Sequence, residues 1–427
     1  MLWLYFECDP RKRRWRSALS FFSFPRFKCR PLERSGKAAA SLLFAFVLLP
    51  HLAVQAHYVA DTTVAETVNV PEDSLPAKKQ KNFRITPFIA PSVSPEVGVM
   101  LTGGGLISFS LDKSGNANAQ PSSIPFSFGY STNGSAYLNA KPALFFKGDK
   151  NRLMGEFWLK DMPDNYWGVG FEKAREPSSP DSTTSYRRNW VQVNLKYAHR
   201  FGKNILAGLL FDFNRTEATE LNPVMQRDPY ILRYGTFIRN WSTGLLLQYD
   251  SRDFTVNAYE GLFLEASSNF YVSETFERPM YWVLVFDYRQ YKTIRRPGRT
   301  FAWQAKTRIG IDRVPWTEMS PLGTPFDLRG YLWGRYRDMI TLLGIAEYRH
   351  MFMRKTPRKD GSMMSRFGFV TWLATGSLAD SYGEMRDWLP NAGIGLRFEV
   401  QKRMNARIDF GIGNDTSALY ISFNEAF

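Results

Sequence analysis

The sequence predicts an all-β protein, folded as a single transmembrane antiparallel β-barrel of about 16 strands. Aromatic residues are abundant, with 34 Phe, 20 Tyr and 12 Trp, yet the mean hydropathy is only -0.31. From residue 83 onward, apolar and polar residues alternate with a period of two, in runs of which many have 10–15 residues. Globular strands usually have about 5–6 residues, whereas a strand that crosses a bilayer needs about 9–11. Lipid-facing and lumen-facing residues alternate along such a strand, so their hydropathies cancel in the average.

The first 56 residues are predicted to be a secretory signal peptide. An apolar run at residues 38–49 is followed by Ala53-Val54-Gln55-Ala56, which is close to the small-x-small pattern that signal peptidase cleaves, with Val54 as a tolerated residue at the -3 position. Residues 1–36 either extend the basic region of the signal or follow from a start codon assigned too far upstream. Both cysteines, Cys8 and Cys29, lie in this segment, so we expect no disulfide or thiol chemistry in the mature chain.

The net charge of +15 overstates the basic character of the mature chain. Residues 1–56 hold ten Lys/Arg and three Asp/Glu, a charge of +7, which leaves +8 for the remainder. Because no compact basic stripe stands out elsewhere, we predict no nucleic-acid partner. Residues 57–82 are polar and contain Pro71 and Pro76, so they are predicted to be a flexible periplasmic leader before a barrel domain at residues 83–427.

Sixteen alternating segments are predicted as strands. In residues 189–199, for example, Val191 and Val193 share one face, and Gln192 and Asn194 share the other. The segments are residues 97–111, 123–132, 135–146, 152–161, 166–172, 185–200, 205–215, 239–250, 262–275, 281–294, 300–313, 339–352, 366–378, 391–401, 404–413 and 418–427. Residues 84–90 could form a further edge segment. A β-sandwich would alternate in the same way, so the length and number of the strands decide for the barrel.

The connections between these segments fall into two groups. Residues 148–150, 202–204 and 401–403 suit tight periplasmic turns, and residues 176–184, 217–233 and 355–364 suit longer surface loops. One connection is much longer than a hairpin needs and carries Phe326-Asp327-Leu328-Arg329-Gly330-Tyr331. An arginine between an apolar residue and a Gly-Tyr pair is unusual at a solvated loop tip. It is explained if the loop folds into the lumen and Arg329 pairs there with a carboxylate.

These residues also carry a family resemblance. Leu328-Arg329-Gly330-Tyr331, the following Gly334-Arg335-Tyr336-Arg337-Asp338 and then Ala346-Glu347-Tyr348-Arg349 resemble the signature of the BamA/TamA family of bacterial outer-membrane surface antigens. The resemblance implies a 16-stranded barrel in the bacterial outer membrane, with Arg329, Gly330 and Tyr331 folded into the lumen. Glu347 is then the acceptor of Arg329, and the four residues form a lumen loop clamp. The family's usual second acceptor is replaced by Ala374, which leaves Asp338 or Asp409 as substitutes.

The same resemblance implies a function. The barrel would assist the insertion or translocation of polypeptide, or of lipid, at a weakly paired seam between its first and last strands. Its expected partners are outer-membrane lipid and an unfolded outer-membrane or secreted client protein, and the barrel itself is expected to be monomeric. The family's barrels usually follow periplasmic POTRA modules, but residues 57–82 are too few to fold into one. The resemblance is therefore to a form without POTRA modules.

The end of the chain resembles the C-terminal signal by which outer-membrane barrels are recognised. Leu419, Ile421, Phe423 and Phe427 are predicted to share the outer face of the last strand, with Phe423 and Phe427 as the signal residues. Glu425 interrupts that face and is expected near the membrane edge, where a charge costs little.

Two other classes of function stay open, a passive outer-membrane channel and an outer-membrane hydrolase. Only His57, His199 and His350 survive removal of the signal peptide, and the sequence has no Gly-x-Ser-x-Gly motif and no His/Cys metal spacing. Gly103-Gly104-Gly105 lacks the Lys-Ser/Thr of a phosphate loop, and we interpret these glycines of an early strand as residues that weaken its pairing or allow a bend. We therefore predict that the protein is not an enzyme and has no cofactor or metal site.

Overall fold

The computed structural model describes residues 2–9, 14–17, 83–94, 97–111, 120–175, 184–275, 277–358, 361–414 and 416–427 of the 427-residue chain. The apolar run of the predicted signal peptide and the predicted leader lie outside the described residues. The division into signal peptide, leader and barrel domain stays a prediction.

The described chain is all-β, as predicted. One antiparallel sheet has 19 strands and a second has two. The large sheet contains β1 (Leu2–Asp9), β2 (Arg14–Ser17), β3 (Phe83–Ser94), β4 (Gly98–Phe109), β5 (Ser122–Ser131), β6 (Ala136–Ala140), β7 (Ala143–Phe146), β8 (Asn151–Asn165), β9 (Ser185–Arg200), β10 (Ile205–Thr219), β11 (Phe237–Asp250), β12 (Gly261–Ser273), β13 (Met280–Thr293), β14 (Arg299–Asp312), β17 (Ile340–Met353), β18 (Met364–Ala379), β19 (Leu389–Gln401), β20 (Met404–Ile412) and β21 (Thr416–Phe423). The small sheet pairs β15 (Ser320–Leu322) with β16 (Tyr336–Asp338), and the helical segments are α2 (Phe171–Arg175), α3 (Pro223–Arg227), α4 (Pro229–Tyr234) and the 3-10 turn η2 (Tyr382–Glu384).

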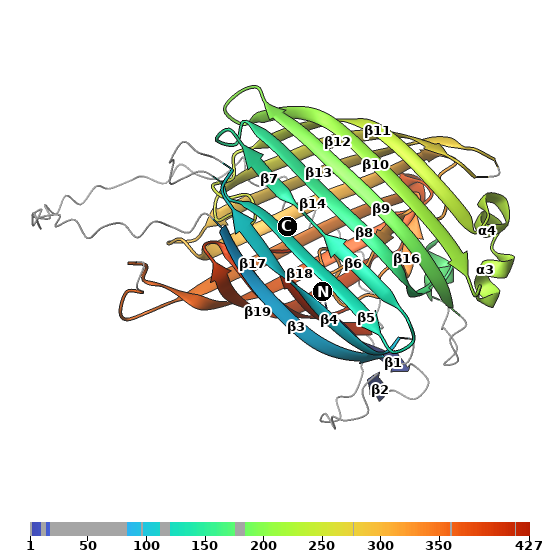
Figure 1. Cartoon of the computed structure of the whole chain (residues 1–427), viewed down its shortest axis with the longest axis horizontal. Helices are drawn as coiled ribbons and strands as arrows, with labels where there is room; N and C mark the ends of the chain where they lie inside the picture. The colour runs from blue at the N-terminus through green and yellow to red at the C-terminus, as the bar shows by residue number, and fades with distance from the viewer. Residues whose placement is uncertain are drawn as a thin grey trace, which may run out of the picture.

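From β3 to β21 the strands of the large sheet pair in chain order, and the sheet curls into a barrel (Figure 1). The strands β6 and β7 share one position between β5 and β8, because Lys141 and Pro142 interrupt what would otherwise be a single strand. A proline cannot donate to a ladder, so it interrupts the strand at this point. The 17 strands from β3 to β21 therefore occupy 16 positions, which agrees with the predicted number.

The agreement in number hides two errors in the prediction. The predicted strand at residues 166–172 is wrong: Gly168 and Gly170 have φ of +100° and +99°, which breaks an extended chain, and α2 follows. The barrel instead begins with β3, which includes the edge segment at residues 84–90. This strand contains Pro87 and Pro91, and proline is tolerated in an edge strand because one side of that strand needs no donor.

Large apolar side chains cover the outer surface of the strands, and polar side chains point into the barrel. On β10 and β11, Leu209 is 60% exposed and Leu245 is 68% exposed, whereas the alternate residues Asp212 and Asn240 are buried. This is the alternation expected of strands that face lipid on one side and a polar lumen on the other. None of the helices in the described residues is long and apolar enough to cross a membrane.

The two ends of the barrel differ in the length of their connections. The turns after β7, β9 and β19 lie at one end, and the long connections after β8, β10 and β14 lie at the other, because antiparallel strands alternate in direction. The connection after β17, which covers most of residues 355–364, lies at the end with the tight turns, so its prediction as a surface loop on the opposite end is wrong. The predicted loop at residues 217–233 is partly β10 and otherwise largely helical, in α3 and α4.

The last four residues leave the sheet. The strand β21 ends at Phe423, Asn424 has a φ of +64°, and Phe427 is buried. A left-handed residue turns the chain, and asparagine adopts this conformation more readily than most residues. The prediction that the strand continues to residue 427 is therefore wrong, and Phe427 does not share the outer face with Phe423.

Candidate functional site

The connection between β14 and β17 folds back into the lumen and carries the predicted arginine motif. We call residues 313–339 the lumen loop. Its local fold depends on Asp327, whose carboxylate accepts from the backbone N–H of Gly323 at 3.0 Å and of Thr324 at 2.6 Å, and from the Thr324 hydroxyl at 2.8 Å. Aspartate side chains commonly form turns of this kind by bonding to nearby backbone N–H groups. The turn places Arg329 against the inner wall of the barrel.

The structure brings Arg329 and Glu347 together. Arg329 is fully buried, its Nη2 pairs with Oε1 of Glu347, and its Nη1 lies 3.0 Å from Oδ2 of Asp409. The guanidinium also stacks on Trp372 at 3.6 Å from the ring centroid. Asp338 and Asp409 were the two candidates for the second acceptor of Arg329, and the structure shows that it is Asp409. Asp338 lies in β16 and accepts from the backbone N–H of Met339.

These residues belong to a larger buried group of charges, which we call the lumen charge cluster. Its members are Arg329, Arg349, Arg397, Arg407, Glu347, Asp409 and Glu425, and all are nine-tenths or more buried. Arg397 joins two acids, with Nη1 at 2.5 Å from Asp409 and Nε at 2.8 Å from Glu425. Each acid of the cluster thus contacts at least one arginine, which offsets part of the cost of removing these charges from water.

Sequence reasoning missed Arg397 and Glu425 as members of this cluster. Glu425 was expected at the membrane edge, but it lies inside the barrel because the chain turns at Asn424. One signal was available: Arg407 and Asp409 alternate with apolar residues on β20, so both had to face the lumen. What the alternation could not supply is the partner of each charge on another strand.

Gly330 and Tyr331 anchor the tip of the lumen loop to the last three strands. Gly330 has a φ of +120°, and a Cβ there would lie 2.7 Å from the backbone carbon of Gly411, so only glycine fits this close approach. Its N–H donates to the Tyr420 hydroxyl at 2.9 Å. The Tyr331 hydroxyl donates to the carbonyl of Pro390 at 2.7 Å. The tip therefore contacts β19, β20 and β21 from inside.

The first and last strands of the barrel meet without a backbone ladder in the described residues. There β3 pairs with β4 alone, and β21 pairs with β20 and with β1. Side chains hold the two ends of the sheet together: the rings of Phe88 and Phe423 lie 5.7 Å apart, and Nε2 of Gln401 donates to the Thr86 hydroxyl at 3.0 Å. We call this junction of β3 and β21 the seam.

The outer edge of β21 is occupied by β1. The two strands are antiparallel, in a register that runs from Leu2 opposite Ile421 to Glu7 opposite Thr416, and β2 pairs with the other edge of β1. Segments that fall within the predicted signal peptide therefore take the place that β3 would hold in a closed ladder. The last strand presents an edge that accepts a strand.

Glu318, in the lumen loop, is a buried acid without an ion-pair partner in the described part of the chain. Its Oε1 accepts from the amides of Asn214 at 2.6 Å and Asn240 at 3.1 Å. Burial, and then the nearby carboxylate of Asp212, raise the pKa of Glu318 to about 7. The loop thus holds a group that titrates near neutral pH.

The histidines considered for catalysis have ordinary surroundings. His199 contacts the amide oxygen of Asn151 at 2.8 Å, and His350 stacks on Phe369. His57 lies outside the described residues. In the parts of the chain that the structure describes, no group of three His, Cys, Asp or Glu residues could hold a metal ion.

Comparison with protein-family models and with the sequences of curated proteins gives no match. Among solved structures, BamA from Haemophilus ducreyi lacking POTRA domains 1–3 is similar over 81% of this chain and 70% of that chain, with 11% identity and a TM-score of 0.47. CdiB from Acinetobacter baumannii is similar over 81% of this chain, with 12% identity and a TM-score of 0.47. The similarity spans 60% of the CdiB chain.

Proposed function

We propose that this protein is a bacterial outer-membrane β-barrel that assists the insertion or translocation of polypeptide at its seam. The observation that carries the proposal is the edge of β21, which pairs with β1 and not with β3. The resemblance of the arginine motif to the BamA/TamA family supports the same assignment. The proposal includes the outer-membrane location and membership of that family.

An edge strand with unsatisfied N–H and C=O groups is a template for another strand. Strand addition gains its affinity from backbone hydrogen bonds, so it admits clients of many sequences. In this chain, β1 supplies the added strand. If residues 1–56 are removed as a signal peptide, the β21 edge becomes free for a strand of a client protein.

The two sides of the seam are built differently. On the β21 side, the tip of the lumen loop anchors the inner wall through Gly330 and Tyr331. On the β3 side, Pro87 pairs with Gly105 on β4, and both residue types weaken strand pairing. We infer that β3 moves away from the seam while β21 stays in place and presents its edge.

Linking the seam tests this proposal. Phe88→Cys and Phe423→Cys are introduced into the chain from residue 57, which has no native cysteine. A short linker that forms a disulfide bond with each of the two cysteines joins them, and dithiothreitol removes it. The protein is reconstituted in liposomes, and the folding of an unfolded small outer-membrane β-barrel is followed by the gel mobility of unboiled samples. Leu209→Cys with Leu245→Cys is the matched control, because these two exposed residues face each other in the continuous ladder of β10 and β11.

We expect the protein to speed client folding, the seam link to abolish this effect, and the reductant to restore it. The control link should change nothing. Unchanged client folding with a linked seam would overturn the proposal. Steady ion conductance together with no effect on client folding would favour a passive channel.

A further inference from the structure

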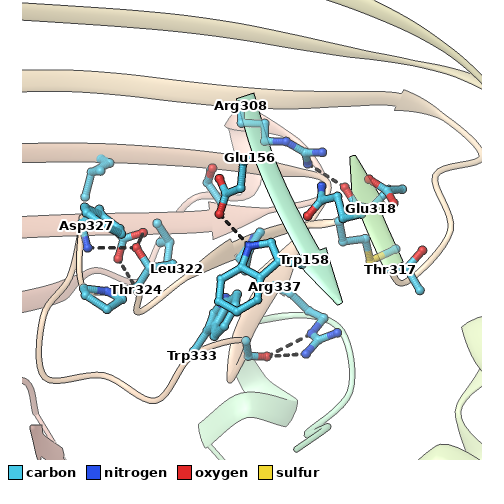
Figure 2. A pocket seen from close by; sticks show the side chains of 18 of the residues that line it. Glu156, Trp158, Arg308, Thr317, Glu318, Leu322, Thr324, Asp327, Trp333 and Arg337 are labelled. Carbon is cyan, nitrogen blue, oxygen red and sulfur yellow. Dashed lines mark hydrogen bonds between the residues drawn. The ribbon is translucent and has the colours of Figure 1, made fainter. Parts of the chain in front are cut away.

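A second feature of the lumen is a cavity of about 530 Å³ beside the lumen loop (Figure 2). Sites for small molecules usually have volumes of about 300–1,000 Å³ and combine apolar walls with a few polar groups. The lining combines aromatic, cationic, acidic and amide side chains, among them Trp158, Trp190, Trp333, Arg188, Lys306, Arg308, Arg337, Glu156, Asp164, Glu318, Asp327 and Gln304. The cavity is distinct from the lumen charge cluster, since none of the cluster's members lines it.

One wall of the cavity consists of three tryptophans. Trp158 on β8 stacks on Trp190 of β9, with ring centroids 5.4 Å apart, and Trp333 of the lumen loop lies 5.8 Å from Trp158. Figure 2 shows Trp158 and Trp333 side by side. An indole offers a broad flat apolar surface at little cost in conformational entropy. Such a surface suits the C–H face of a sugar ring.

The carboxylates that line the cavity are engaged with other groups. Glu156 pairs with Lys141 at 2.7 Å, Asp164 pairs with Lys160 at 2.9 Å, and Asp327 accepts from the backbone of its own loop.

Two cations of the lining, Lys306 and Arg308, have no carboxylate in direct contact. Lys306 makes no hydrogen bond or ion pair with any described residue. Arg308 donates through Nη1 to two neutral oxygens, the carbonyl of Glu318 at 2.6 Å and the Ser320 hydroxyl at 2.8 Å. Arg337 donates to a backbone carbonyl of its own loop. These cations favour a ligand with an anionic group, because a charge-assisted hydrogen bond is stronger than a neutral one.

A cationic ligand is disfavoured for a second reason. Two of the three rings already have one cation of the protein over them, Arg188 at 4.3 Å from the ring centroid of Trp190 and Lys160 at 5.7 Å from that of Trp333. A wholly apolar ligand would remove Lys306 from water without a partner, which is costly. The hydroxyl groups of a sugar ring could instead form hydrogen bonds with the side-chain amide of Gln304, which lies on β14 like Lys306.

We propose that this cavity binds a soluble acidic saccharide, a sugar ring that carries a carboxylate or a phosphate. The ring lies against Trp333 and Trp158, and Lys306 with Arg308 holds the anionic group. The site is independent of the seam, so it stands whether or not the barrel inserts clients.

Binding is measured by isothermal titration calorimetry on the full chain in detergent micelles. The probes are D-glucuronate, D-glucose 6-phosphate, D-glucose and inorganic phosphate. We expect both acidic sugars to bind more tightly than glucose and than phosphate, because only they use both parts of the site. Lys306→Gln and Trp333→Ala should each weaken the binding of glucuronate by about tenfold or more, whereas Lys306→Arg should retain it.

Two control variants lie outside the cavity. Trp282→Ala removes an exposed tryptophan on the outer face of β13, and Arg239→Gln removes an exposed arginine at the start of β11. Neither should alter binding. Equal affinity for glucuronate and glucose, phosphate binding as tight as that of glucose 6-phosphate, or no binding of any probe would each overturn the proposal.

Discussion

Arg329→Ala is the substitution whose effect the structure specifies best. The guanidinium is fully buried and contacts Glu347, Asp409 and the face of Trp372. Removal of one partner of a buried ion pair costs about 3–5 kcal/mol, because the other charge is left without compensation. The loss of a desolvated contact between a cation and an aromatic ring adds up to about 2 kcal/mol.

Other arginines in the lumen charge cluster limit the loss. Glu347 keeps Arg349 at 2.9 Å, and Asp409 keeps Arg397 at 2.5 Å. We therefore expect Arg329→Ala to lower the free energy of unfolding by about 4 kcal/mol, within the range of large single-site effects. Arg329→Lys should lose less, since the charge remains but cannot bond to both acids in the geometry of a guanidinium.

The assay is a urea titration of the barrel in detergent micelles, read by the gel mobility of unboiled samples. The midpoint should fall while the slope stays unchanged, because the surface exposed on unfolding is the same. Arg313→Ala is the control: this arginine of the same loop is exposed and lies 3.4 Å from Glu277, so its loss should change stability by less than about 0.5 kcal/mol. If Arg329→Ala has no larger effect than Arg313→Ala, Arg329 does not brace the lumen.

Three further predictions concern the loop. Gly411→Ala should lower stability by about 1–3 kcal/mol in the same titration, because its Cβ would overlap the carbonyl oxygen of Arg329, whereas Gly202→Ala points into open space and should be neutral. Tyr331→Phe should cost about 0.5–1.5 kcal/mol, because it removes the hydrogen bonds that the hydroxyl makes to the carbonyl of Pro390 and from the backbone N–H of Asn414. Burial raises the pKa of Glu318 from 4.5 to about 7, so the folded barrel holds this proton more tightly than the unfolded chain. The contribution of Glu318 to stability should therefore be full below about pH 4.5 and be lost as the pH rises through 7, and Glu318→Gln should flatten the pH dependence of stability in that range.

The fold followed from the alternation of apolar and polar residues. Barrel strands have the same period wherever they lie, so most of the strands could be placed from the sequence. The errors occurred where single residues override that period. Residues 166–172 have the alternation expected of a strand, but Gly168 and Gly170 adopt positive φ. In the last strand, the alternation of apolar and polar residues continues past Asn424, although the chain turns there.

The candidate site could be predicted only in part. Arg329 was conspicuous because an arginine between an apolar residue and a Gly-Tyr pair, in a connection too long for a hairpin, is explained by a buried acceptor. The choice of Asp409 over Asp338 depends on which strand the loop tip reaches across the lumen, and no local pattern contains that information. For the same reason the cavity could not be predicted. Trp158 and Trp190 lie on the paired strands β8 and β9, but Trp333 joins them only when the lumen loop folds back into the barrel.

The most direct test of the seam is amide hydrogen exchange on the chain from residue 57 in lipid nanodiscs. Without β1, the account predicts that the amides of β3 and β21 exchange much faster than those of β10, which pairs with a strand on each side. Adding a peptide with the sequence of Leu2–Asp9 should then restore protection to β21 and not to β3. Equal protection of β3, β21 and β10 without the peptide would show a closed ladder and contradict the account.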